Sequence, residues 1–361
     1  MMQRRSFVTF ALGLVGLRIA PSSAQSDHYP NRSIRLVVPF APGGGVDVFA
    51  RVLAEKLKEQ KRTTVVVENR PGANGSIGGS AVQHSSPDGY TLLFSAATHV
   101  MARQVMLAAP YDPVTDFTPI ARVGMAPMLL VMSPNLAPNT ITELLEQTRR
   151  EPERWTFAAS ALGSPGHVAT ISFNKLAGLN LVIAAYRGTA PGLADVAAGH
   201  VQLMIDPVLA LLPMARGRQI KALATTAAQR SVLAPDIATA AESGMPGLEF
   251  ASWYGVWGPR DLPSGVVQWF NAAANEATRD LAKSGRLADL GIEAVAETPD
   301  EFARFIGADM RVQPVMVMPE THIQQILEYY MGKNTQERQE FIINNLKIEL
   351  DLVEETPPAG Q

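Results

Sequence analysis

The residues best suited to bind a ligand form a glycine-rich segment, residues 39–45 (PFAPGGG), between a predicted strand and a predicted helix. Residues 34–38 are a β-rich run, and residues 46–60 place apolar side chains at helical spacing. Glycines remove side chains where the backbone turns and let a ligand approach backbone N–H groups. A helix start adds free N–H groups and the positive end of the helix dipole, so the segment is typical of an anion site. Taken alone, it is equally consistent with a plain strand-to-helix turn.

A second segment repeats this arrangement at residues 160–167 (SALGSPGH), again between a predicted strand and a predicted helix. Two such segments facing each other across a cleft suit a small anion with one or two carboxylates. Tyr186 can close over a ligand or donate its hydroxyl, and it can equally be a half-buried tyrosine. Asp206 ends a predicted strand and can accept from a ligand amine or hydroxyl, or simply occupy the turn before Pro207.

Other chemistries fit the residues less well. Ser164, His167 and Asp206 are the best trio for a serine hydrolase, but no Gly-x-Ser-x-Gly elbow surrounds Ser164, and a capping serine beside a partly buried histidine explains the pair. Neither glycine segment has the lysine and spacing of a phosphate-binding loop or a dinucleotide fingerprint. The histidines are scattered without metal-ligand spacing, so we expect no metal and no cofactor.

Composition supports an exported, folded, two-domain protein. The chain has 361 residues, of which 47% are hydrophobic and 18% charged, and this length suits two domains. A net charge of −3 gives no basic field for nucleic acid. Residues 1–24 resemble an export signal, with Arg4 and Arg5 before the apolar run 7–17 and small residues ending at Ala24. The arginine pair leaves the export route open.

Strand and helix signals alternate in two series, which predicts an α/β fold with a mostly parallel sheet. The first series has strands at 34–38, 63–67 and 90–94. The second, with strands from 128–132 to 220–225, predicts a second domain, and residues 253–257 predict a strand returning to the first. Capping-box patterns at Thr140 and Thr298 predict two helix starts.

A series of motifs resembles one family over about residues 29–310. In order they are PFAPGGGVD from Pro39, VENRPGA from Val67, PDGYTLL from Pro87, YDP from Tyr111, DF from Asp116, GSPGH from Gly163, YRG from Tyr186, GHVQLM from Gly199, and Pro263. Together they resemble the Bug-type substrate-binding receptors of tripartite tricarboxylate transporters.

The resemblance implies a type II periplasmic binding protein with two Rossmann-like lobes, 25–127 plus 254–310 and 128–253, joined by hinge strands. It implies a monomer in the periplasm that is no enzyme and passes a dicarboxylate, tricarboxylate, acidic amino acid or aromatic acid to the membrane components of the transporter. The implied ligand contacts are Ala41, Pro42, Gly43, Gly44 and Asp47 in the first lobe, and Ser160, Ser164, Tyr186, Gly188 and Asp206 in the second.

The sequence departs from the family pattern at three places. Val46 replaces a usual threonine, and Pro207 replaces an asparagine that often follows the aspartate. Within the atypical tail, residues 311–361, the segment 321–355 resembles the end of a type II topoisomerase B subunit. The tail therefore raises an alternative, a non-functional fusion of a truncated receptor.

Overall fold

The computed structural model describes residues 29–102, 106, 109–230 and 234–312. The predicted leader (1–24) and the topoisomerase-like segment (321–355) lie outside these residues. Strands and helices alternate from the start, as the sequence predicts. The elements of this first part are β1 (Ile34–Val38), α1 (Gly45–Lys61), β2 (Val65–Asn69), α2 (Ser76–Gln83) and β3 (Thr91–Ala96).

One long strand, β4 (Phe117–Met132), runs through both halves of the molecule. Its first part pairs with β9, as far as Pro127, and its second part, Met128–Met132, pairs with β7 and β8. The sequence indicated only residues 128–132, because prolines within the first part weaken a strand signal. The pairing with β9 shifts register at two places, and such irregularities tolerate proline in a strand.

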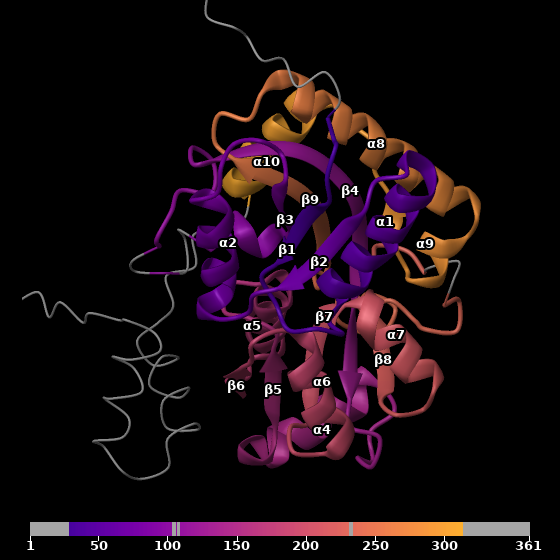
Figure 1. Ribbon diagram of the computed structural model, residues 1–361. Coiled ribbons are helices and arrows are strands. Elements are labelled where there is room, and N and C mark those ends of the chain that lie inside the picture. The colour runs from indigo at the N-terminus through magenta and orange to yellow at the C-terminus, as the bar shows by residue number, and fades with distance from the viewer. Residues whose placement is uncertain (1–28, 103–105, 107–108, 231–233, 313–361) are drawn as a thin grey trace, which may run out of the picture.

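The second series of elements forms the lower half of Figure 1. These elements are α4 (Ile141–Arg150), β5 (Thr156–Ala159), α5 (Pro165–Ala177), β6 (Val182–Ala185), α6 (Thr189–Ala198), β7 (Leu203–Pro207), α7 (Val208–Arg216) and β8 (Lys221–Thr225). The chain then returns to the upper half, as expected, through β9 (Ala251–Pro259), α8 (Ser264–Lys283), α9 (Arg286–Asp289), β10 (Glu293–Ala294) and α10 (Pro299–Val312).

The described strands follow the order β2-β1-β3-β9-β4-β7-β5-β6, with β8 and β10 also pairing with β4. Strands β1, β2 and β3 are parallel to one another, as are β5, β6 and β7. Strands β4 and β9 run antiparallel to their neighbours. The prediction of a mostly parallel sheet is therefore wrong. The sheet is mixed because β4 and β9 carry the chain between the halves in opposite directions.

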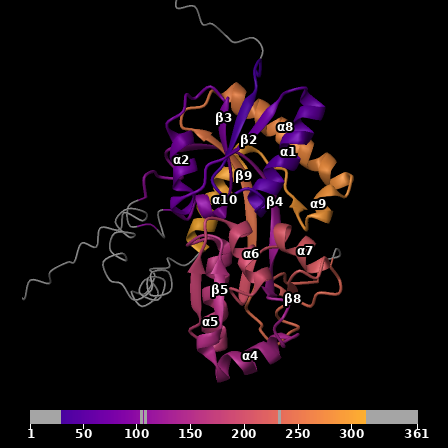
Figure 2. The same ribbon diagram turned by 60° about the horizontal axis from the view of Figure 1, so that its bottom comes forward.

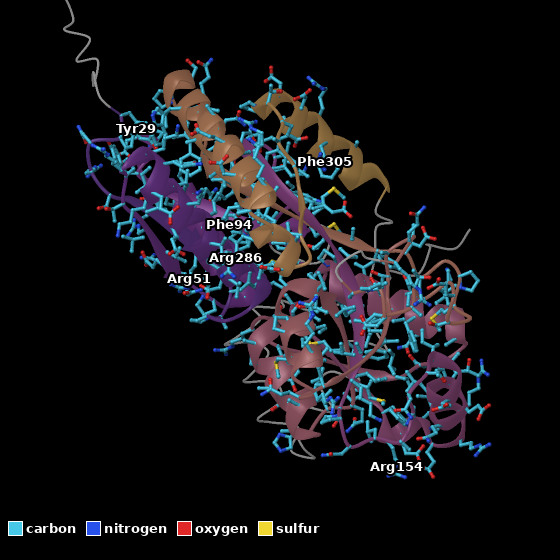
Figure 3. The ribbon with its side chains drawn as sticks, turned by 90° about the vertical axis from the view of Figure 1, so that its right-hand side faces the viewer. Tyr29, Arg51, Phe94, Arg154, Arg286 and Phe305 are labelled. Atoms are coloured by element: carbon cyan, nitrogen blue, oxygen red, sulfur yellow. The ribbon has the colours of Figure 1, made fainter. Side chains whose placement is uncertain are left out.

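Helices cover both halves and give the molecule an elongated, two-part shape (Figure 2). In Figure 3, Tyr29 lies at one end and Arg154 at the other. In the upper half Trp253, Trp257 and Phe302 are buried between the sheet and α10. In the lower half Phe157 and Phe173 stack edge to face at 5.3 Å within a separate core cluster.

Both predicted helix caps are present, but only the one at Thr298 forms the full capping box, because Glu143 accepts from the N–H of Asn139 and not from that of Thr140. The Thr140 hydroxyl accepts from the N–H of Glu143 at 3.1 Å, and the Thr298 hydroxyl accepts from Glu301 N at 3.2 Å. Glu301 also accepts from the N–H of Thr298, which closes the reciprocal pair. The sequence reading missed α7, because this helix follows Asp206-Pro207 directly and contains Pro213.

Candidate functional site

The loop between β1 and α1 brings a bare helix start to the boundary between the halves. Gly44 is the N-cap residue of α1 and makes no side-chain capping bond. Gly43 has φ of +82°, a left-handed conformation that favours glycine. A Cβ on Gly44 would lie 3.5 Å from the Cβ of Thr189 in the other half. The lack of side chains in this loop therefore lets the starts of α1 and α6 approach closely.

Asp47 is buried behind this loop and braces it. Its carboxylate accepts from the N–H of Gly43 at 2.9 Å, and it also accepts from Arg51 and Asn69. Asn69 donates in addition to the carbonyl of Phe40 at 3.0 Å. Burial raises the pKa of Asp47, but the hydrogen bonds from Arg51, Gly43 and Asn69 outweigh burial and hold the pKa below its ordinary value. Asp47 thus fixes the loop conformation from behind.

The loop between β5 and α5 provides the second helix start. Ser164 caps α5, its hydroxyl accepting from the N–H of His167 at 3.1 Å. The Nδ1 atom of His167 accepts from the N–H of Gly163 at 2.9 Å. Both side chains therefore stabilise the helix start. This agrees with the interpretation of Ser164 as a capping serine beside a buried histidine, and not with a hydrolase pair. Pro165 is the first residue of α5, a position where its missing N–H costs no helical hydrogen bond.

Replacing Ser164 with alanine is expected to lower stability by about 1 kcal/mol, because the substitution removes a helix cap. Thermal unfolding measures this loss. Thr140→Ala is the matched control, since it removes an equivalent cap at 3.1 Å on α4. Ser164→Ala alone should also weaken binding of an acid in the cavity described below. If Ser164→Ala and Thr140→Ala bind the acid with equal affinity, Ser164 does not contact the ligand.

Asp206 lies at the end of β7, and its side chain is 1% exposed. The hydroxyl of Ser160 donates to Oδ1 at 2.8 Å, and the hydroxyl of Thr189 donates to Oδ2. Burial raises the pKa of Asp206 to about 6, although these two hydrogen bonds act in the opposite direction. A Cβ on Gly166 would lie 2.5 Å from Oδ1, so only glycine fits beside the carboxylate.

A small cavity of about 30 Å³ lies where these loops meet, room for about two water molecules. Five predicted site residues line it: Gly44 comes from the upper half, and Ser160, Ser164, Gly188 and Asp206 come from the lower half. Its lining is Phe40, Gly44, Gly45, Val46, Ala96, Thr98, Ser160, Ser164, Pro165, Gly188, Thr189, Asp206, Pro207, Ser252 and Tyr254.

The other five predicted residues lie outside the cavity lining. Asp47 braces the first loop, and the hydroxyl of Tyr186 donates to Asp195 in its own half at 2.7 Å. Pro42 and Gly43 are exposed. Ala41 instead joins the halves, its N–H donating to the carbonyl of Arg187 at 3.3 Å.

Sequence reasoning missed several polar residues of the cavity. Thr189 directly follows the Tyr186-Arg187-Gly188 motif, and its place at the start of α6 was the available signal. Thr98, Ser252 and Tyr254 carried none, because they approach from β9 and the turn after β3. The hydroxyl oxygens of Ser252 and Tyr254 are buried, and neither has a hydrogen-bond partner of ordinary geometry among the described residues. Burial, and secondly the charge of Asp206, raise the pKa of Tyr254, while the neighbouring Ser252 hydroxyl opposes them.

A larger hollow of about 1,020 Å³ lies on the lower half, between the start of α4, α7 and β8. None of the predicted site residues lines this hollow, and its lining residues all belong to the lower half. Among the described residues, no group of three histidines or acids is placed to hold a metal ion. None of the described helices is long and apolar enough to cross a membrane.

The small cavity contains hydroxyl groups and helix starts from both halves, while arginine and lysine are missing from its lining. Neutral donors of this kind hold a carboxylate without a counter-ion. Two α/β halves joined by crossing strands, with a site between them, define the periplasmic binding protein class. Solved structures of this class resemble the chain. The periplasmic binding protein BugD has a TM-score of 0.74 at 30% identity, covering 87% of this chain and 97% of BugD.

Two ligand complexes are similar to the chain as well. Rpa4515 from R. palustris, solved with adipate, has a TM-score of 0.77 at 33% identity, with 80% of this chain and 97% of that one covered. MatC from Rhodopseudomonas palustris, solved with bound malate, has a TM-score of 0.74 at 29% identity, with 80% and 99% covered.

Residues 49–318 match the family described as "Tripartite tricarboxylate transporter family receptor". BugT from Bordetella pertussis is 34% identical over 310 residues, which are 84% of this chain and 95% of BugT. The chain belongs to the tripartite tricarboxylate transporter receptor family. These relatives are binding receptors and not enzymes. The topoisomerase-like interpretation of 321–355 finds no support among them.

Proposed function

We propose that this chain captures a small carboxylic acid between its two lobes and presents it to the membrane components of a tripartite tricarboxylate transporter. The observation that carries the proposal is the cavity at the lobe boundary, where two helix starts and several hydroxyls meet around Asp206. The adipate and malate complexes of the similar structures support the ligand class.

In this proposal the ligand contacts come from both lobes. Gly44 and Gly188 offer backbone N–H groups at the starts of α1 and α6, while Ser164 offers its hydroxyl proton. Ser160 lines the same cavity and holds the Asp206 carboxylate, to which its own proton is donated. Asp206 accepts a hydrogen bond from the ligand.

The remaining predicted residues act indirectly. Ala41, Pro42 and Gly43 would reach the ligand through bound water. Asp47 and Tyr186 would support the site from behind, through the bonds to Gly43 and Asp195 described above.

We assign residues 25–127 plus 254–310 to lobe 1 and residues 128–253 to lobe 2. The hinges would be β4 at Pro127–Met128 and the chain entering β9, since these segments join the two parts of the sheet. A ligand that contacts both lobes stabilises the closed form, and this form is what the transporter would distinguish. A cavity of 30 Å³ is too small for such an acid, so the lobes must open to admit it. Closure around the acid then expels water from the site.

The family members are periplasmic, and we propose the same location for this chain. Cleavage near Ala24 would release the leader, residues 1–24, and leave a monomer beginning at Gln25.

Asp206 narrows the ligand class. A carboxylate facing this buried acid meets like charge, whereas a hydroxyl or amine beside the ligand carboxylate can donate to it. We therefore expect malate to bind at least tenfold more tightly than succinate, which lacks only the hydroxyl. Hydrogen bonds to charged groups contribute about 1.5–3 kcal/mol, which sets this ratio.

Isothermal titration of the chain from Gln25 with malate, succinate, aspartate, citrate and adipate tests both statements. Binding of any of them supports the receptor proposal, and binding of none contradicts it for these acids. Asp206→Asn should erase the preference for malate over succinate. A preference that survives in Asp206→Asn would mean that another group reads the hydroxyl. Glu143→Gln, on the distant helix α4, is a control that should leave every affinity unchanged.

A further inference from the structure

Asn74 makes a reciprocal pair of hydrogen bonds between the two lobes. Its side-chain Nδ2 donates to the carbonyl of Leu162 at 2.7 Å, and the N–H of Leu162 donates to Oδ1 of Asn74 at 2.9 Å. The two residues are 88 positions apart in sequence. Asn74 lies in a short 3-10 turn between β2 and α2, and Leu162 lies in the loop between β5 and α5. The two loops come from different lobes, so the pair can exist only when the lobes are together.

Each partner of this pair is attached to one wall of the cavity. Leu162 lies between Ser160 and Ser164, which both line it. On the other side, the turn that holds Asn74 rests on the first loop, since a Cβ on Gly75 would lie 3.3 Å from Pro39 and 3.4 Å from the Phe40 ring. Phe40 also lines the cavity. The pair therefore holds the two walls of the site at a fixed separation.

Backbone conformation explains why asparagine suits this position. Asn74 has φ of +56°, in the left-handed region that asparagine tolerates better than most residues. Its amide offers one donor and one acceptor in a plane, which matches the N–H and C=O of Leu162. Another described bond across the lobes, from Ala41 N–H to Arg187, is longer at 3.3 Å and involves backbone alone.

We propose that Asn74 is a closure latch, a positioning residue that holds the closed form around the ligand without touching the ligand. The proposal rests on the proposed function for its ligand-dependent test. Such a latch forms after the ligand has entered the open cleft. Its loss therefore speeds ligand dissociation and leaves association unchanged.

Asn74→Gly is the variant of choice, because glycine adopts φ of +56° without strain and removes only the amide. With malate as the probe, we expect about a tenfold faster dissociation rate from the loss of two neutral hydrogen bonds. Asn74→Asp keeps the acceptor but sets an oxygen against the carbonyl of Leu162, and it should dissociate at least as fast. Both variants should melt like wild type without ligand. A role confined to local folding would lower that melting temperature and leave dissociation unchanged.

The matched control is Asn31→Gly, whose amide oxygen accepts only from Tyr90 within the same lobe among the bonds described. It should bind and release malate as wild type does. Stopped-flow measurement of malate association and dissociation compares the four proteins. If wild type binds malate and Asn74→Gly releases it at the same rate, the latch is overturned while the receptor function stands.

A ligand-independent readout covers the case in which no acid of the panel binds. The sequence has no cysteine, so Glu55→Cys on α1 and Glu146→Cys on α4 place two spin labels, both at exposed positions, one on each lobe. The ligand-free chain is expected to sample the closed form as a minor state, which the latch stabilises. The distance distribution between the labels should therefore lose its shortest component in Asn74→Gly. An unchanged distribution would contradict the latch, whatever the ligand proves to be.

Discussion

Gly166→Ala is expected to lower the free energy of unfolding by about 3 kcal/mol and to abolish ligand binding. The added Cβ would lie 2.5 Å from Oδ1 of Asp206 and still closer to the carbonyl oxygen of Ile205. Neither neighbour can move aside easily, since both belong to β7 in the middle of the sheet. Overpacking of this kind costs about 1–3 kcal/mol, and here it also forces α5 away from the cavity.

Denaturant unfolding and malate titration measure the two effects of Gly166→Ala. Gly265→Ala is the control, because Gly265 also lies in the first turn of a helix, α8, and its added Cβ meets no atom within 4 Å. We expect the control to match wild type in binding. Full stability in Gly166→Ala would show that α5 and β7 are less tightly packed than the structure has them.

Asp206→Asn is expected to make the chain more stable than wild type at pH 8 but not at pH 4. The folded pKa of Asp206, about 6, lies above its ordinary value of 3.8 because the carboxylate is buried. Its contribution to stability is therefore fully present below about pH 4 and is lost as pH rises through 6. The largest difference is about 3 kcal/mol, since each pKa unit corresponds to about 1.4 kcal/mol.

Urea unfolding of both proteins between pH 4 and pH 8 tests this expectation. His99 titrates in part of the same range, with its pKa lowered by burial to about 3, and it destabilises the fold as pH falls. The difference between wild type and Asp206→Asn cancels that effect. Tyr254, whose pKa is raised, stays neutral throughout. A difference that does not change with pH would mean that Asp206 is more hydrated than its 1% exposure indicates.

Local signals in the sequence predicted most elements of each lobe. Residues 156–159 form β5 as expected, and the caps at Thr140 and Thr298 begin α4 and α10. These predictions succeeded because periodicity, caps and glycine turns depend on residues close together in the chain. The same local reasoning failed at β4, where prolines concealed a strand whose partners, β9 and β7, come from distant positions.

The sequence by itself determined the two glycine-rich helix starts, the absence of cysteine chemistry and the family resemblance. Only the tertiary structure decided which side chains meet at the cavity. In the structure, Asp47 and Tyr186 bond to Gly43 and Asp195 and do not line the cavity. Thr189, Ser252 and Tyr254 instead line it together with Asp206. The reason is that a site between lobes is formed by contacts over long sequence separations. Asn74 and Leu162, 88 positions apart, lie in ordinary loops when each is considered alone, and only closure of the lobes joins them.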